Sequence, residues 1–286
     1  MDRLSLLAPA LVFVAVLVVA FVVYGALCAI GRAPKLTAVK HNQLFGPFLA
    51  GFLVWVLAPI ERALRGRVSP SVVTAASLVL CAATGLAVSG GHLANAVWLY
   101  ALAGILDVLD GRLARQAGKP SAVGALFDSV SDRWGELFVF TGYAWLVHDS
   151  AWLFAVMAAI AGSMMVSYTR ARAEGLGVEL AGGVMQRAER IVLVALGTLV
   201  AAWVGVEPSG ADLVAPIVGV TLALCGALSS ATAINRWIAA HRAIAARERA
   251  SVIVVTPEPE PVAQVARPAM LTASAELRKV RPLEQH

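Results

Sequence analysis

The sequence predicts an all-α integral membrane protein. Of its 286 residues, 59% are hydrophobic and only 14% are charged, which is too apolar for a soluble globular domain. Several apolar stretches approach the roughly 20 residues that a helix needs to cross a bilayer, and basic residues gather at alternate links between them. The net charge of +5 is therefore expected to face cytoplasmic lipid headgroups and not nucleic acid.

The first apolar stretch, residues 7–30, predicts an uncleaved anchor helix. It is too long for the core of a typical signal peptide, and no convincing A-x-A cleavage site follows it. Arg32, Lys35 and Lys40 come next, which places the end of this helix in the cytoplasm. We expect residues 1–40 to form an N-terminal anchor helix and a basic linker.

Residues 41–68 predict an amphipathic helix that lies at the membrane interface. Apolar residues such as Trp55 and Leu57 precede Glu61 and a basic cluster, a pattern that suits an interfacial helix. The basic cluster consists of Arg62, Arg65 and Arg67. A short membrane-spanning helix is the competing interpretation.

Residues 69–245 predict a catalytic domain of six membrane helices. Ser69 and Pro70 suit a helix start, and links such as SGGH and HDS lack Lys and Arg, whereas the other helix ends carry arginines. This asymmetry places the basic ends in the cytoplasm. The six predicted spans are residues 72–89, 93–114, 124–147, 151–174, 189–206 and 212–239.

Residues 246–286 predict a disordered cytoplasmic tail. The segment contains PEPEPV and scattered charges without helical periodicity. Such a composition does not supply enough apolar side chains to form a packed core.

Four aspartates within this apolar sequence provide the main functional signal. Asp107 and Asp110 are three residues apart, and Asp128 and Asp132 are four apart, so each pair lies on one face of a helix. Carboxylates at membrane depth are costly and are by default functional. Two acidic helix faces joined by a short loop predict a site for one or two hard divalent cations.

The aspartates belong to a longer motif. Residues 107–132 read DVLDGRLARQAGKPSAVGALFDSVSD, or D-x2-D-G-x2-A-R-x8-G-x3-D-x3-D. This pattern resembles the signature of the CDP-alcohol phosphotransferase (CDP-alcohol phosphatidyltransferase) family, and the resemblance extends over about residues 44–240. It implies a six-helix bundle, here with an interfacial helix and one extra anchor helix, that forms a homodimer in the cell inner or plasma membrane.

The resemblance also implies a reaction. A CDP-linked lipid, CDP-diacylglycerol, donates its phosphatidyl group to an alcohol and releases CMP at a cytoplasm-facing cavity that holds Mg²⁺ or Mn²⁺, with two ions expected. Asp107, Asp110 and Asp128 match metal ligands. Asp132 matches the general base and is also expected near a metal. The positions that match contacts to the CDP-lipid are Ser71, Thr74, Gly111, Arg115 and Ser121.

A second basic group predicts the acceptor. The stretches SYTRARAE (167–174) and QRAER (186–190) resemble the branch that makes phosphatidylinositol phosphate from inositol phosphate, although Arg170 replaces a lysine of that branch. Arginines suit a phosphorylated acceptor, so we expect Arg170, Arg190 and Arg236 to bind its phosphate. Glycerol 3-phosphate, the acceptor of phosphatidylglycerophosphate synthases, is the main alternative.

Three other interpretations of the aspartates compete with this one. The aspartates would be structural if they only paired with Arg112, Arg115 and Arg133, but functionless acids at membrane depth are rare. A divalent-cation transporter would be expected to carry acids on both sides of the membrane, whereas here all four lie on one side. A catalytically inactive lipid-binding homologue is disfavoured by the complete set of aspartates.

Overall fold

The computed structural model describes residues 3–32, 46–116, 121–180 and 182–255, and within these ranges the regular structure is entirely helical. The helices are α1 (Arg3–Ala29), α2 (Gly46–Leu64), α3 (Pro70–Ser89), α4 (Leu93–Gln116), α5 (Ala122–Leu146), α6 (Leu153–Gly175), α7 (Arg187–Val204), the short 3-10 helix η1 (Pro208–Gly210) and α8 (Ala211–Val255). The predicted spans agree with α3 to α7 to within a few residues.

The end of α8 differs from the prediction. The helix continues to Val255, past the predicted end of the last span at residue 239 and past the predicted start of the tail at residue 246. Residues 240–250 read AHRAIAARERA, and alanine and arginine are strong helix formers even where hydrophobicity is low. The rest of the predicted tail, and most of the predicted basic linker after α1, lie outside the described residues.

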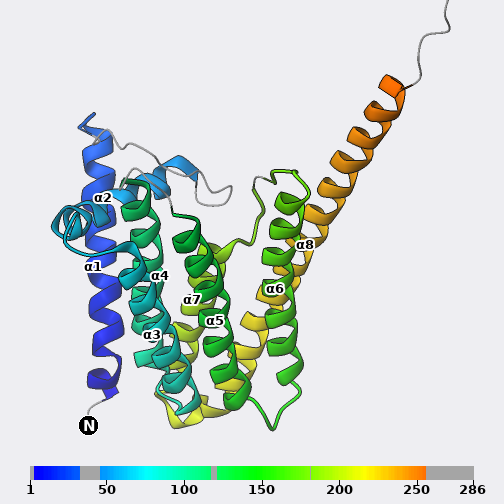
Figure 1. Ribbon diagram of the computed structural model, residues 1–286. Coiled ribbons are helices and arrows are strands. Elements are labelled where there is room, and N and C mark those ends of the chain that lie inside the picture. The colour runs from blue at the N-terminus through cyan, green and yellow to red at the C-terminus, as the bar shows by residue number, and fades with distance from the viewer. Residues whose placement is uncertain (1–2, 33–45, 117–120, 181, 256–286) are drawn as a thin grey trace, which may run out of the picture. The chain divides into compact units, whose positions relative to one another are not determined.

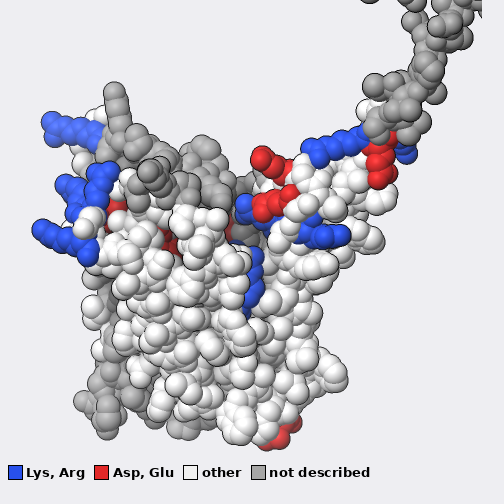
Figure 2. All heavy atoms as spheres, in the orientation of Figure 1, with Lys and Arg blue, Asp and Glu red and all other residues white. Residues whose placement is uncertain are grey.

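The distribution of charge is typical of an integral membrane protein. Within the described residues, four helices are long and apolar enough to cross a membrane, namely α3, α4, α6 and the stretch 208–250 that contains most of α8. On the face shown in Figure 2, charged side chains gather at one end of the helices and the long flank is almost free of them. α5 and α7 are not among these four helices, and their charged residues that line the site are described below.

The bundle is built around α3, which contacts both α4 and α5, while α4 also contacts α7 (Figure 1). Two glycines allow α3 and α5 to approach closely, because a Cβ on Gly142 would lie only 2.7 Å from the Cα of Gly85. A similar approach joins α6 and α8, where a Cβ on Gly162 would lie 2.8 Å from the carbonyl oxygen of Gly226. Small residues at such crossings are a common way of packing membrane helices.

The two N-terminal helices pack on this bundle. α1 contacts α4, α7 and α2, and α2 also contacts α4. α2 therefore lies against the helix that carries Asp107 and Asp110, and it contributes to the site described next.

Candidate active site

Three of the four predicted aspartates meet at the junction of α4 and α5. Asp107, Asp110 and Asp128 each offer a carboxylate oxygen, and these atoms all lie within 4.8 Å of one another. The C-terminal half of α4 supplies the first two and the N-terminal half of α5 supplies the third. Three carboxylates this close repel one another unless a cation lies between them, and oxygen-only ligands suit Mg²⁺ or Mn²⁺. The residues present therefore fit a hard divalent cation.

Asp110 is held in place by α3. The Thr74 hydroxyl, one turn into α3, donates a 2.6 Å hydrogen bond to Oδ2 of Asp110, and both side chains are buried. Hydrogen bonds of this kind fix the orientation of a metal-binding carboxylate. Thr74, which was predicted to contact the nucleotide, thus contacts a predicted metal ligand in the structure.

Asp132 lies in a different arrangement from the other three. Arg187, at the start of α7, donates from Nη1 to Oδ1 of Asp132 and also to Oδ1 of Asp107. Nη1 of Arg133 lies 3.9 Å from the other oxygen of Asp132. Asp132 is not a member of the group of three carboxylates. Arg187 belongs to the QRAER stretch of the sequence, and the structure places its guanidinium between two of the key acids.

Arg190 is part of a buried ion pair that the sequence analysis missed. Its Nε donates to Oε1 of Glu136 at 3.0 Å, its Nη2 donates to the same oxygen, and its Nη1 donates to the carbonyl of Met185 at 3.2 Å. The Arg190 side chain is only 2% exposed. The spacing contained a signal for Glu136, because it lies four residues after Asp132 and continues the acidic face of α5.

The other two predicted acceptor arginines have different surroundings. Arg236 of α8 donates to the carbonyl of Gly182 from Nε and Nη2, at 3.2 and 2.7 Å, and to the carbonyl of Val166 at 2.9 Å. Arg170 of α6 pairs with Glu174 at 2.8 Å and has a side chain that is 42% exposed. Arg236 thus ties α8 to α6 and to the link before α7, whereas Arg170 remains accessible.

One cavity of about 770 Å³ brings these groups together. All four aspartates and all three predicted acceptor arginines line it, as do Gly111, Arg115 and Arg187. At Gly111 a Cβ would lie 3.3 Å from Nη1 of Arg115, so the glycine lets this guanidinium fold back along the wall. The acids of the cavity therefore lie mainly on α4 and α5, which also contribute Arg112, Arg115 and Arg133, whereas α6, α7 and α8 contribute mainly arginines.

Three predicted nucleotide contacts lie outside this lining. Besides Thr74, these are Ser71, which is exposed in the first turn of α3, and Ser121, which is exposed just before α5. The hydroxyl of Ser121 accepts a 3.4 Å hydrogen bond from the backbone N–H of Gly124 and so caps α5. Serine is a favoured residue at this position, and this structural role is independent of any ligand.

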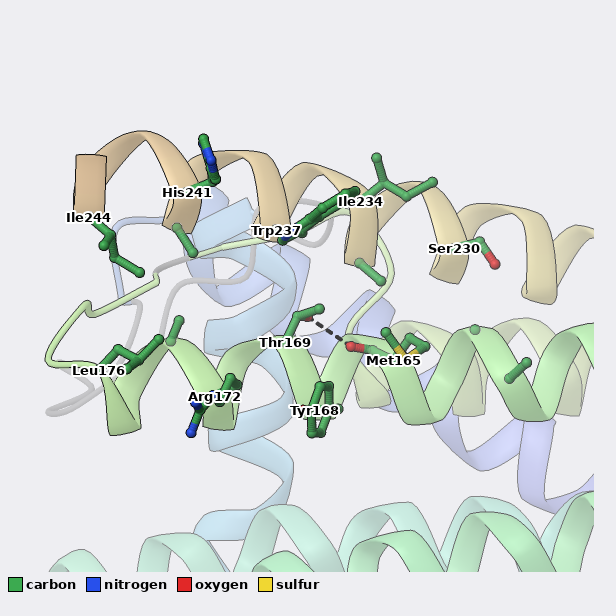
Figure 3. A pocket seen from close by; sticks show the side chains of 15 residues that line it. Met165, Tyr168, Thr169, Arg172, Leu176, Ser230, Ile234, Trp237, His241 and Ile244 are labelled. Carbon is green, nitrogen blue, oxygen red and sulfur yellow. Dashed lines mark hydrogen bonds between the residues drawn. The ribbon is translucent and has the colours of Figure 1, made fainter. Parts of the chain in front are cut away.

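A second cavity, of about 600 Å³, lies between α6 and α8 (Figure 3). Its lining is mainly apolar and includes Met165, Leu176, Ile234 and Trp237, and none of the four aspartates contributes to it. It is therefore separate from the charged cavity.

Clustered carboxylates facing arginines, at one end of apolar helices, define a class of metal-dependent membrane enzymes that act on phosphate groups. The sequence matches the CDP-alcohol phosphatidyltransferase family over residues 67–227, more than half of the chain. The chain belongs to this family and is an integral membrane transferase. This finding decides against the cation-transporter alternative.

Individual relatives carry more specific names. A phosphatidylinositol phosphate synthase of Cutibacterium acnes is 35% identical over 196 residues, which cover 66% of this chain and 93% of the relative. An archaetidylinositol phosphate synthase of Methanothermobacter thermautotrophicus is 40% identical over 122 residues, which cover 43% of this chain and only 61% of the relative's length.

Solved structures of the Mycobacterium tuberculosis phosphatidylinositol phosphate synthase have a similar fold. The structure with CDP-DAG bound has a TM-score of 0.56 and 28% identity and covers 65% of this chain and 94% of that chain. A complex of the same enzyme with manganese and citrate has a TM-score of 0.56 and 29% identity and covers 64% of this chain and 87% of that chain.

Proposed function

We propose that this protein transfers the phosphatidyl group of CDP-diacylglycerol to inositol phosphate and releases CMP. The observation that carries the proposal is a single cavity with three carboxylates within 4.8 Å of one another and three predicted acceptor arginines in its wall. The names of the relatives, and the CDP-DAG bound to a solved neighbour, support this choice of donor and acceptor.

Asp107, Asp110 and Asp128 would hold the divalent cation, with two ions expected and Asp132 beside them. When bound, Mg²⁺ or Mn²⁺ neutralises the pyrophosphate of the donor and the charge that develops on the leaving CMP. The manganese complex of the mycobacterial enzyme supports this assignment.

The donor's CDP moiety is proposed to lie along the start of the motif. Gly111 leaves room for a close approach of the ligand, and Arg115 offers a fork of donors to phosphate oxygens. Ser71 and Ser121 remain proposed contacts, because both are exposed at the first turns of helices, where backbone N–H groups favour an anion. Thr74 would act through Asp110.

Asp132 is proposed to be the general base. The acceptor's hydroxyl oxygen forms a bond to the phosphorus that carries diacylglycerol, the bond from this phosphorus to the CMP oxygen breaks, and the hydroxyl proton passes to a carboxylate oxygen of Asp132. Arg187 positions this carboxylate through its hydrogen bond to Oδ1. The same guanidinium joins the base to Asp107.

The acceptor's phosphate is proposed to bind among Arg170, Arg190 and Arg236. Arg190 and Arg236 already donate to protein oxygens, but a guanidinium has five N–H donors, so each retains N–H groups for a phosphate. Arg170 is the most accessible of the three. We therefore propose that Arg190 and Arg236, which are held by hydrogen bonds to the protein, contact the phosphate from fixed positions, and that the accessible Arg170 provides a further contact.

We propose the following membrane arrangement. The six helices α3 to α8, within residues 69–245, span the bilayer with the charged cavity toward the cytoplasm. Residues 1–40 provide the anchor, α2 lies at the interface within residues 41–68, and residues 246–286 begin as the end of α8 and continue as a cytoplasmic tail. A homodimer is proposed on the basis of family resemblance.

An acceptor screen tests the proposed function. Purified protein with CDP-diacylglycerol and Mg²⁺ is expected to release CMP when inositol phosphate is added, and not with inositol or serine. A clear preference for glycerol 3-phosphate would replace the proposed acceptor and leave the reaction class intact. Absence of CMP with every acceptor would overturn the proposal.

A further inference from the structure

The charged cavity has one strongly apolar wall, and it comes from α2. Leu49, Phe52, Leu53 and Val54 line the same cavity as the aspartates and arginines. The other apolar residues of the described lining are alanines and valines, so α2 supplies every leucine and phenylalanine in it. We refer to these four residues as the α2 wall.

Phe52 of the α2 wall also belongs to an aromatic cluster with α1. Its ring centroid lies 5.2 Å from that of Phe21 in an edge-to-face arrangement and 5.8 Å from that of Tyr24. Tyr24 is 5% exposed and also contacts Phe48 and Trp55 of α2, with centroids 5.3 and 5.6 Å apart. These separations are typical of favourable aromatic pairs, so α1 packs directly against a residue of the α2 wall.

The C-terminal half of α2 has a second attachment. Glu61 accepts a 2.5 Å hydrogen bond from Nε of Arg112 on α4, and the two side chains are 8% and 10% exposed. Arg112 itself lines the cavity next to Gly111. α2 is therefore fixed to α1 by aromatic rings and to α4 by an ion pair.

We propose that the acyl part of the donor lipid packs against the α2 wall, and that Phe21 and Tyr24 of α1 are positioning residues that hold Phe52 for this contact. The inference rests on the proposed function, since it assumes a nucleotide-linked lipid as donor. Such a donor needs an apolar surface beside its pyrophosphate, because apolar contact stabilises binding in proportion to the buried area. Both helices lie outside the residues matched by the family.

Point variants of the full chain test the inference. Tyr24→Ala and Phe21→Ala are expected to raise the apparent KM for CDP-diacylglycerol about three- to tenfold and to leave the KM of the acceptor unchanged. Tyr24→Phe, which keeps the ring, should restore the wild-type KM. Val22→Ala is the matched control, because Val22 is 63% exposed on the same helix.

Ligand-induced thermal stabilisation separates positioning from general damage. In the Tyr24→Ala variant, stabilisation by CDP-diacylglycerol should fall, whereas stabilisation by CDP alone should match the wild type. Equal loss for both ligands, or an unchanged donor KM, would overturn the inference. Should Tyr24→Ala fail to fold, Phe52→Leu tests the inference in the same assays, because it replaces the aromatic ring of the α2 wall with a smaller apolar side chain.

The same measurements distinguish the two levels of proposal. Suppose that the wild type releases CMP and is stabilised by CDP-diacylglycerol, and that the variants behave identically. This result would refute only the role of α1 and the α2 wall. A wild-type protein that does neither would refute the proposed function, and this inference with it.

Discussion

Thr74 shows how much of the site depends on residues that have no direct chemical role. Its hydroxyl is 2.6 Å from Oδ2 of Asp110, and it comes from a helix other than the one that carries the aspartate. The orientation of a predicted metal ligand on α4 therefore depends on the placement of α3.

We expect Thr74→Val to weaken divalent-cation binding about tenfold, because it removes the hydrogen bond that orients Asp110 while preserving the shape of the side chain. The measurement is the Mg²⁺ dependence of CMP release. Thr84→Val is the control, since the Thr84 hydroxyl on the same helix donates to the backbone carbonyl of Leu80. A similar Mg²⁺ requirement in both variants would contradict the assignment.

We expect Asp132→Asn to reduce kcat by about a hundredfold or more, because an amide cannot accept the acceptor's proton. Binding of CDP should persist, since the three clustered carboxylates remain. The rate of CMP release measures turnover, and the thermal shift caused by CDP measures nucleotide binding. The first should be lost in this variant and the second retained. Asp149→Asn, whose side chain is 89% exposed, should behave as the wild type, and normal turnover in Asp132→Asn would exclude it as the base.

Local sequence spacing predicted the acids better than their partners. Asp107, Asp110 and Asp128 belong to one motif, in which helical periodicity places the first two on one face and a short link separates them from the helix of the third. Arg187 lies 80 residues from Asp107 along the chain and on a helix whose packing no local pattern specifies. Glu136 continues the local spacing of the acids on α5, but its pairing with Arg190 could not be predicted for the same reason, because the two residues are 54 positions apart.

At the scale of elements, hydrophobic stretches located the helices and glycines set how closely they pack. The bounds of the predicted spans agree with those of helices α3 to α7, although only α3, α4 and α6 of these five are long and apolar enough to cross a membrane. The predicted end of the last helix was wrong, because residues 240–250 favour a helix although they are less hydrophobic than the preceding span. The contact of α1 with α2 was beyond prediction, since two apolar helices contain no local information on which faces meet.

We expect Gly142→Ala to lower stability by about 1–3 kcal/mol or more, because the added methyl group would overlap the backbone of Gly85. Separation of α3 from α5 would also move Thr74 relative to Asp128, so activity should fall as well. Thermal unfolding in detergent measures the first effect. Gly175→Ala is the control, with nothing within 4 Å of the added Cβ, and a comparable loss in both variants would argue against the close crossing.

At the scale of the whole molecule, the charge distribution predicts the orientation in the membrane. The link before α6 contains Asp149, and the opposite end of α6 carries Arg172. After Cys28 is replaced by Ser, a cysteine at position 149 should react with a membrane-impermeant maleimide from outside intact cells, and one at position 172 only after permeabilisation. The native Cys81 and Cys225 are buried, which limits their background labelling. The reverse pattern would place the site on the outer side.

The junction of α4 and α5 has a practical consequence for handling this protein. Asp107, Asp110 and Asp128 crowd one point, and their mutual repulsion grows when chelators remove the counter-ions. Buffers with EDTA are therefore expected to lower the melting temperature of the purified protein, and millimolar Mg²⁺ to restore it, even in the absence of nucleotide. Equal melting curves in the two buffers would indicate that the three acids tolerate one another without an ion.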